Sequence, residues 1–188
     1  MYLHNNPKQG TLLAIDPGNE QSAFCFVDIE TYKPLFFAKE PNQEAMQHMI
    51  EVCSDPANNV ICVAIEMLAS YGMNIGRTCL ETAKEIGRFQ ERLSDYVDEV
   101  NYIYRKDEKI CICGHMQAKD SNIRQALIDR FAEFDTKNGR GTKNNPDWFY
   151  GFKADIWQSY AVAVCWVDAK RGLYTLNCDE KGEIKNGE

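Results

Sequence analysis

The chain lacks the features that would place it in a membrane or outside the cell. None of its apolar runs approaches the roughly 18 residues that a spanning helix needs, and its first residues lack the basic-then-apolar pattern of a secretion signal. We therefore expect a cytoplasmic protein without a membrane partner. The 188 residues, 44% of them hydrophobic and with only 6 prolines and 12 glycines, are enough to close one well-packed core.

Positive charge is also scarce. The chain has 21 Lys and Arg residues against 28 Asp and Glu residues, a formal net charge of −7. Domains that bind nucleic acid through their overall charge are normally basic, so any DNA binding here must depend on local patches. Carboxylates that coordinate Mg²⁺ are one exception, because the bound ions reverse the local field.

Cysteine is plentiful, but its positions do not suggest cross-links or zinc. Several of the eight cysteines, among them Cys25, Cys62 and Cys165, lie in apolar runs, where cysteine behaves as a small hydrophobe. We expect reduced, buried thiols. The segment Cys111–His115 (C-I-C-G-H) resembles half of a zinc motif, but no second Cys or His pair follows at a suitable spacing. We therefore expect no zinc site.

The hydrophobic pattern predicts one α/β domain over residues 1–171 and a polar C-terminal tail over residues 172–188, to which we assign no structure. Two apolar runs joined by a Pro-Gly turn and followed by a third run predict an antiparallel meander. A later, nearly all-apolar run is typical of a strand covered on both faces in a parallel arrangement. Strands are expected at 10–17, 22–28, 34–39, 60–65 and 100–104, and helices at 42–53, 75–96, 121–134 and 156–167.

Acidic residues stand at the ends of these elements. Asp16 ends the first strand and Glu66 follows the fourth, so their carboxylates emerge side by side if the two strands are neighbours. Asp155 begins the last helix and completes the cluster if that helix packs across the same edge. Three such carboxylates repel one another unless a hard cation lies between them, and oxygen ligands suit Mg²⁺ or Mn²⁺. Two ions about 3.5–4 Å apart can clamp a phosphodiester for attack by water. The pattern predicts a metal-dependent nuclease.

Each acid also has an ordinary explanation. An Asp before Pro-Gly is a common turn former, and an Asp before a helix is a common N-cap. Glu66 is harder to explain in this way, because it ends a six-residue apolar strand, where an ionisable side chain risks burial.

Four segments, taken together, resemble the RuvC-type Holliday junction resolvases. Leu13–Gly18 (L-A-I-D-P-G) and Val63–Glu66 (V-A-I-E) resemble the two catalytic strands of that family, and the helix that begins at Asp155 resembles its final acidic helix. Lys109, Gly114 and Lys119 lie in a stretch similar to the family's lysine-bearing segment, which implies a short helix ending at Gly114. The likeness runs from about residue 12 to residue 167. The amino-acid sequences of residues 66–73 and 119–124 resemble those of the bacteriophage branch of the group.

This resemblance implies an RNase H-like fold with a mixed five-stranded sheet, three antiparallel strands followed by two parallel ones. It also implies a homodimer that makes paired cuts in a four-way DNA junction, in the host cytoplasm if the protein is phage-encoded. Asp16, Glu66 and Asp155 would be the catalytic residues and would hold Mg²⁺ or Mn²⁺, as two ions. The expected helix over residues 75–96 has more apolar surface than one small sheet needs, which also suggests a dimer contact.

The chain departs from the family at two positions. Bacterial members usually carry an acid three residues after the position of Asp155, where this chain has Gln158. An amide oxygen can still ligate a metal but brings no charge. Either Asp155 fills the acidic role alone, or Asp147 reaches in from the preceding loop, or activity is reduced. The second departure is Lys119, which stands one residue before the family's usual lysine.

Candidate DNA contacts lie outside the acidic positions. Tyr71 could stack on an unpaired base, although covering the core is an equally ordinary role for a loop aromatic. Residues 136–146 form a basic, Gly- and Asn-rich stretch without periodicity, which predicts a mobile loop. Solvated surface is the usual role of such charges. The candidates for phosphate contacts are Lys109, Lys119, Lys137, Arg140 and Lys143.

The function that the sequence predicts is a structure-selective endonuclease acting on branched DNA. One alternative is a junction-binding protein without catalysis, suggested by Gln158. Another is an ATP-handling enzyme of the sugar-kinase and actin type, which also uses an Asp-x-Gly hairpin near metal-bound phosphates. That fold needs two such domains, and no second Gly-rich hairpin is present.

Overall fold

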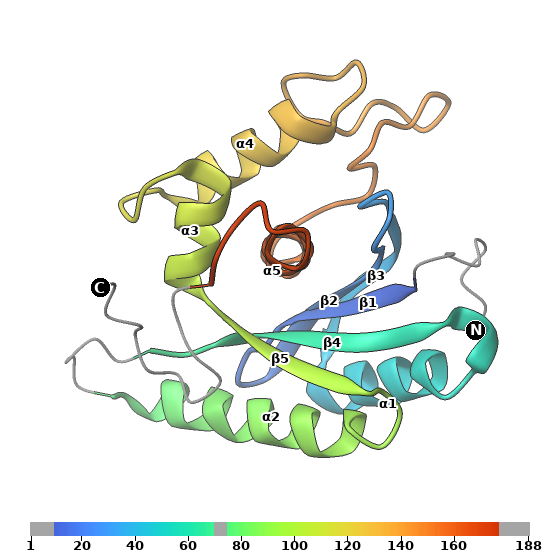
Figure 1. The fold of residues 1–188 in the computed structure, drawn as a ribbon, viewed down its shortest axis with the longest axis vertical. Coiled ribbons are helices and arrows are strands. Elements are labelled where there is room, and N and C mark those ends of the chain that lie inside the picture. Colours follow the sequence, from blue (N-terminus) through green and yellow to red (C-terminus); the bar gives the residue numbers. More distant parts are fainter. Residues whose placement is uncertain (1–9, 70–74, 177–188) are drawn as a thin grey trace.

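The computed structural model describes residues 10–69 and 75–176 and contains a central sheet with helices on both faces (Figure 1). The strands are β1 (Thr11–Asp16), β2 (Gln21–Asp28), β3 (Pro34–Pro41), β4 (Val60–Met67) and β5 (Glu99–Tyr104). The helices are α1 (Asn42–Cys53), a short 3-10 helix η1 (Pro56–Asn58), α2 (Arg77–Leu93), α3 (Arg105–Cys113), α4 (Asp120–Phe131) and α5 (Ile156–Lys170).

The sheet has the strand order β3-β2-β1-β4-β5. β1, β2 and β3 pair antiparallel, whereas β4 pairs parallel with both β1 and β5. This confirms the predicted mixed five-stranded sheet of the RNase H-like type. Because β1 and β4 are parallel neighbours, their carboxyl ends meet at the same edge, as the grouping of the acids required.

The two faces of the sheet are covered differently (Figure 1). α1 and α2 lie on one face, where Leu13, Ile15 and Phe24 belong to one apolar cluster. α5 lies on the other face, between the sheet and α3 and α4, and contacts small strand residues such as Ala14 and Ala23. α5 is buried on nearly all sides, which explains why its sequence is apolar without a polar face.

The observed bounds differ from the expected ones at several element ends. α4 ends at Phe131 rather than at residue 134, which leaves Phe134 beyond the helix and exposed. β4 continues to Met67, so Glu66 lies inside the strand rather than after it. α2 ends at Leu93, which leaves Tyr96 beyond the helix and exposed. α3 was implied only by the family resemblance, and it does end at Gly114, whose φ of 76° is the left-handed conformation that favours glycine at a helix C-terminus.

The cysteines and the helix lengths of the described residues bear on two expectations from composition. All seven cysteines in residues 10–69 and 75–176 are free thiols, and Cys25, Cys62 and Cys165 are buried, as expected. No helix in the described part of the chain is long and apolar enough to cross a membrane.

Candidate functional site

Three charged residues share one face at the edge of the sheet. The register of β1 and β4 pairs Ile15 with Ile65, so the next residues, Asp16 and Glu66, are neighbours. Asp16 pairs with Ala23 of β2, and Ala23 pairs with Lys39 of β3. Aligned residues of adjacent strands point to the same face. Since Ala23 packs in the cluster beneath α5, the side chains of Lys39, Asp16 and Glu66 lie on the α5 face.

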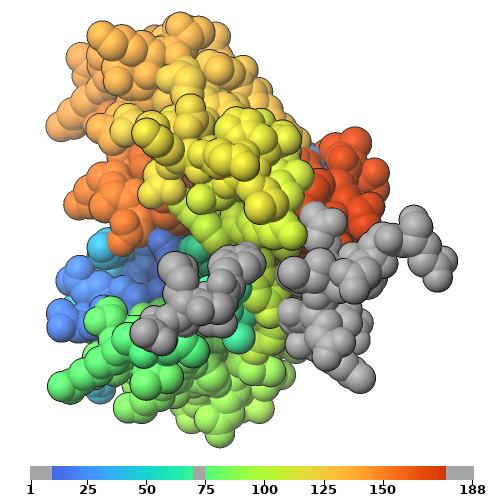
Figure 2. Space-filling model, turned by 90° about the vertical axis from the view of Figure 1, so that its left-hand side faces the viewer, coloured from blue at the N-terminus to red at the C-terminus, as the bar shows by residue number. Residues whose placement is uncertain are grey.

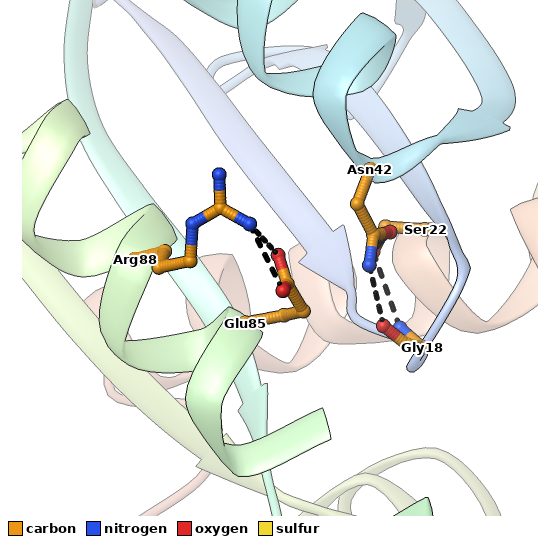
Figure 3. A network of polar contacts seen from close by, with 5 residues as sticks. All are labelled: Gly18, Ser22, Asn42, Glu85 and Arg88. Carbon is orange, nitrogen blue, oxygen red and sulfur yellow. Dashed lines mark hydrogen bonds and ion pairs between the residues drawn. The ribbon is translucent and has the colours of Figure 1, made fainter. Parts of the chain in front are cut away.

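The turn that follows Asp16 is held by polar contacts with the start of α1 (Figure 3). The Gly18 N–H donates to Ser22 Oγ at 3.2 Å, the Ser22 hydroxyl donates to Asn42 Oδ1 at 2.8 Å, and Asn42 Nδ2 donates to the Gly18 carbonyl at 3.0 Å. A Cβ at Gly18 would lie 2.3 Å from the carbonyl oxygen of Gln21, so the turn requires glycine. These contacts fix the backbone on which the Asp16 carboxyl is carried.

The carboxyls of Asp16 and Glu66 lie on adjacent strands and each affects the pKa of the other. Burial, and then the charge of Glu66, raise the pKa of Asp16 well above its ordinary value of 3.8. Burial also raises the pKa of Glu66, although the nearby Arg105 lowers it. Raised pKa values favour the protonated form, and a bound cation could take the place of that proton.

Asp155 is placed beside this pair at the start of α5. Its carboxylate makes no capping hydrogen bond to the helix, which removes the N-cap explanation for this residue. It forms an ion pair with Lys39 instead, and its side chain is 49% exposed. Its charge acts on both Asp16 and Glu66. The structure therefore brings together the three acids that the sequence singled out.

Arg105 and Glu108, at the start of α3, belong to the same cluster but were not anticipated. Arg105 donates to Glu108 Oε2 at 2.5 Å and also to Asp120, and its Nε lies 3.9 Å from Glu66 Oε1. The Glu108 side chain is fully buried, and its Oε1 has no hydrogen-bond partner. Burial and then the charge of Glu66 raise the pKa of Glu108 well above 4.5. The only signal in the sequence was the i,i+3 spacing of an Arg and a Glu, which does not tell which way they face.

Negative charge exceeds positive charge in this cluster. Its carboxyls belong to Asp16, Glu66, Glu108, Asp120 and Asp155, and its cations to Lys39 and Arg105. Burying unbalanced carboxylates is unfavourable, and a divalent cation is one way to offset it. The oxygen donors and the orphaned Glu108 Oε1 therefore suit Mg²⁺ or Mn²⁺ in chemical type.

The carboxylates are not gathered around a single point, however. In the part of the chain that the structure describes, no three His, Cys, Asp or Glu side chains are placed to hold one metal ion. Lys39 engages Asp155, and Arg105 engages Glu108 and Asp120. Metal binding requires these side chains to exchange partners.

Asp147 does not reach this cluster, so that alternative was wrong. Its buried carboxylate accepts hydrogen bonds from the backbone N–H groups of four residues, Glu133, Phe134, Asp135 and Trp148. Burial opposes ionisation, but these hydrogen bonds outweigh it and lower the pKa of Asp147 to about 2. The Asp135 carboxylate accepts further hydrogen bonds from the backbone N–H groups of residues 138, 140 and 141. The two aspartates therefore fix the backbone of the stretch expected to be a mobile loop.

The remaining predicted residues are dispersed around the cluster. Gln158 and Lys137 line a surface cavity together with Arg124 and Trp157, and the Arg124 guanidinium lies 4.7 Å from the centre of the Trp157 ring. Lys119 is exposed at the N-cap of α4, and Lys109 is partly buried in α3. Lys143 is exposed in the loop, and Arg140 is partly buried there. Tyr71 lies outside the described residues.

Figure 2 shows the face on which these segments meet. The blue N-terminal strands, the orange segment before α5 and the yellow-green helices α3 and α4 lie around one surface. Segments from the N-terminal and the C-terminal parts of the sequence therefore lie next to one another on this face.

Comparison with known proteins relates this fold to resolvases. No protein-family model matches the chain, and no curated protein matches it in sequence. Among solved structures it is similar to RuvC of Thermus thermophilus, with a TM-score of 0.58 and 16% identity over 86% of this chain and 96% of that chain. RuvC from T. thermophilus in complex with a Holliday junction substrate matches with a TM-score of 0.58 and 13% identity, over 87% and 96% of the two chains.

A third similar structure is the yeast mitochondrial Holliday junction resolvase Ydc2, with a TM-score of 0.52 and 14% identity over 90% of this chain and 82% of that chain. At such identities the likeness establishes the fold. The expected RuvC-like arrangement is therefore confirmed.

Proposed function

We propose that the protein is a structure-selective endonuclease that cleaves phosphodiester bonds in branched DNA, with a four-way junction as its substrate. The observation that carries this proposal is the placement of Asp16 and Glu66 next to each other at the ends of two paired parallel strands, with Asp155 beside them, on the fold of RuvC-type resolvases.

Asp16, Glu66 and Asp155 are the residues that would hold Mg²⁺ or Mn²⁺, as two ions. Divalent cations at such a site supply Lewis-acid charge for phosphodiester hydrolysis by water. The chain's own part is to ionise Asp16 and Glu66, whose pKa values are raised, and to free Asp155 from Lys39. The turn held by Asn42 keeps Asp16 in place while the side chains exchange partners.

Gln158 is not proposed as a necessary ligand, because it lines the cavity next to Arg124 and Lys137. That cavity, with the exposed Lys119 and Lys143, suits the DNA arms beside the cutting site. Lys109 and Arg140 are weaker candidates, since both are partly buried.

We also propose a homodimer, in keeping with paired cuts in a symmetric junction. The support is the exposure of Ile75 and Leu80, at 54% and 60%, near the start of α2. Exposed apolar surface of this kind is covered by a partner when it forms a contiguous patch. The assignment to a phage-type branch and to a single domain over residues 1–171 rests on the sequence alone.

A labelled four-way junction tests the nuclease proposal. It is incubated with the protein beside a linear duplex of the same arms, in Mg²⁺, Mn²⁺ or EDTA. We expect symmetric, metal-dependent nicking of the junction and little cutting of the duplex. Absence of cutting under all conditions contradicts a nuclease.

The same assay distinguishes a second candidate function, a non-catalytic junction-binding protein. Two observations favour it: Gln158 stands where an acid is usual, and no three ligands are gathered in the described residues. Tight junction binding without cleavage in Mg²⁺ or Mn²⁺ would support it.

A further inference from the structure

Two cations flank the adjacent pair of carboxyls on opposite sides. Lys39 lies on the β3 side of the sheet, in the row that leads through Ala23 to Asp16. Arg105 lies on the β5 side and faces Glu66. The order along this edge is therefore cation, acid, acid, cation. A chain with a net charge of −7 must bind an anionic strand through such local positions.

Each cation is paired on its outer side with an exposed acid. Lys39 contacts Asp155, whose side chain is 49% exposed, and Arg105 contacts Asp120, whose side chain is 69% exposed. Ion pairs with such exposed groups contribute little to stability, because water solvates the separated charges well. These outer contacts can therefore be exchanged for another anion at low cost.

The inner side of Arg105 is different. Glu108 is fully buried and accepts from Arg105 Nη1, so it keeps the guanidinium at the cluster while the outer Nη2 exchanges partners. Glu108 Oε1 has no hydrogen-bond partner, so the bond from Arg105 to Oε2 is the contact that holds this buried carboxyl. A guanidinium held by one edge presents its remaining N–H groups in a fixed direction, which suits a phosphate.

We propose that Lys39 and Arg105 bind two backbone phosphates of the DNA strand on either side of the cutting site. The phosphates replace Asp155 and Asp120 as partners, and Glu108 is the positioning residue for Arg105. This inference rests on the proposed function, since it assumes that branched DNA lies across this edge. It assigns a substrate contact to two residues that nothing in the sequence pattern had marked.

The alternative is that both are structural ion pairs of the kind found elsewhere in the chain. Glu85 and Arg88 of α2 are one such pair, with Arg88 donating to both Glu85 oxygens at 3.0 Å (Figure 3). It has the same i,i+3 spacing as Arg105 and Glu108 but lies on the face of the sheet away from α5. Arg88 therefore provides a matched control.

The test is the salt dependence of junction binding, measured in EDTA so that no cleavage occurs. Each phosphate contact releases counterions and contributes about 0.9 to the slope of log affinity against log salt concentration. Two variants are compared with the wild type. One is Lys39→Gln, and the other is the double variant Arg105→Gln with Glu108→Gln, in which both charges of the inner ion pair are removed so that neither is left buried without a partner. We expect each to lower the magnitude of the slope by about 0.9 and all three changes together by about 1.8. Arg88→Gln should leave the slope unchanged.

Thermal melting first establishes that each variant is folded. If the Arg105 and Glu108 double variant does not fold, Arg105→Lys replaces it. That variant keeps the positive charge, so the salt-dependence slope should stay unchanged. It should bind the junction more weakly, because the lysine ammonium group lacks the planar pair of N–H donors with which a guanidinium binds phosphate.

The outcomes separate this inference from the proposed function. A wild-type chain that binds the junction, with slopes unchanged in the folded Lys39→Gln variant and in the folded double variant Arg105→Gln with Glu108→Gln, overturns the inference alone. Wild-type affinity for the junction in the Arg105→Lys variant would overturn the proposed phosphate contact of Arg105. A wild-type chain that binds no branched DNA at low salt contradicts the proposed function as well.

Discussion

Both ends of α5 carry aspartates in polar surroundings, but these surroundings differ in charge balance. At the C-terminal end, Asp168 accepts two hydrogen bonds from Arg130, at 2.6 and 2.8 Å, and one from the Tyr32 hydroxyl at 2.7 Å. Burial alone would raise the pKa of Asp168, but these donors lower it. At the N-terminal end, burial and the neighbouring acids raise the pKa of Asp16.

Burial therefore does not distinguish the two ends. One carboxylate with its own arginine and tyrosine is a satisfied structural network, whereas five carboxyls with two cations form a cluster that favours protonation or a bound metal. Shifts caused by burial together with crowding of like charges are typical of functional sites. The following predictions test whether the ends differ in this way.

The largest expected effect is loss of cleavage at the N-terminal end. Glu66→Gln keeps the shape of the side chain but removes its charge, and we expect the rate of junction cleavage to fall more than about 100-fold, beyond the loss typical of an outer-shell residue. Junction binding in EDTA should persist. Glu85→Gln, a buried acid on the opposite face of the sheet, is the control and should cleave normally. Near wild-type cleavage by Glu66→Gln would show that the cluster is not the catalytic site.

The C-terminal end should respond in stability rather than in cleavage. Asp168→Asn weakens the bonds to Arg130 and Tyr32, and we expect a loss of about 2–3 kcal/mol in the free energy of unfolding. The partly exposed Arg130 can turn toward water, which limits the loss. The melting temperature should fall by about 4–12 °C, and cleavage well below it should stay within about twofold of wild type. Stable folding with impaired cleavage would reverse the assignment of the two ends.

The pH dependence of stability should have opposite signs at the two ends. Raised pKa values at Asp16 and Glu66 mean that the folded state holds protons that the unfolded state releases above the ordinary values of 3.8 and 4.5. This contribution to stability is therefore lost as pH rises through the raised values. For Asp168, with its lowered pKa, the contribution is lost as pH falls below 3.8.

Urea unfolding in EDTA, between about pH 5 and pH 8, measures the first of these effects. The wild-type chain should lose stability with rising pH, and the double variant Asp16→Asn with Glu66→Gln should lose less. Equal slopes in the two proteins would mean that the carboxyl pair holds no extra proton.

The smallest effect is expected at Gln158. Because it lines the cavity with Arg124 and Lys137, Gln158→Ala should change the cleavage rate by less than about threefold and leave metal-dependent stabilisation intact. A loss comparable to that of Glu66→Gln would show that the amide oxygen ligates the metal.

The strands and the three acids could be predicted because they depend on local patterns, whereas the pairing of β1 with β4 depends on contacts between distant segments. Asp16 and Glu66 each follow an apolar strand, and the turn at Pro17 and Gly18 is set by short-range chemistry. Gly18 has no room for a Cβ, which is a constraint of the turn itself. Asp147 shows the limit of such reasoning, since its loop position indicated nothing about the four N–H groups that bind it.

The sequence by itself determined the alternation of apolar and polar residues, and with it most of the elements and the acids at the ends of two strands. Hydrophobic periodicity is a short-range property, so it can be recognised in the chain alone. Only the tertiary structure decided which charges meet across the edge of the sheet. Lys39 and Asp155 are 116 residues apart, and Arg105 is 39 positions from Glu66. Their electrostatic interaction depends on distance in space and on burial, and neither is set by position along the chain.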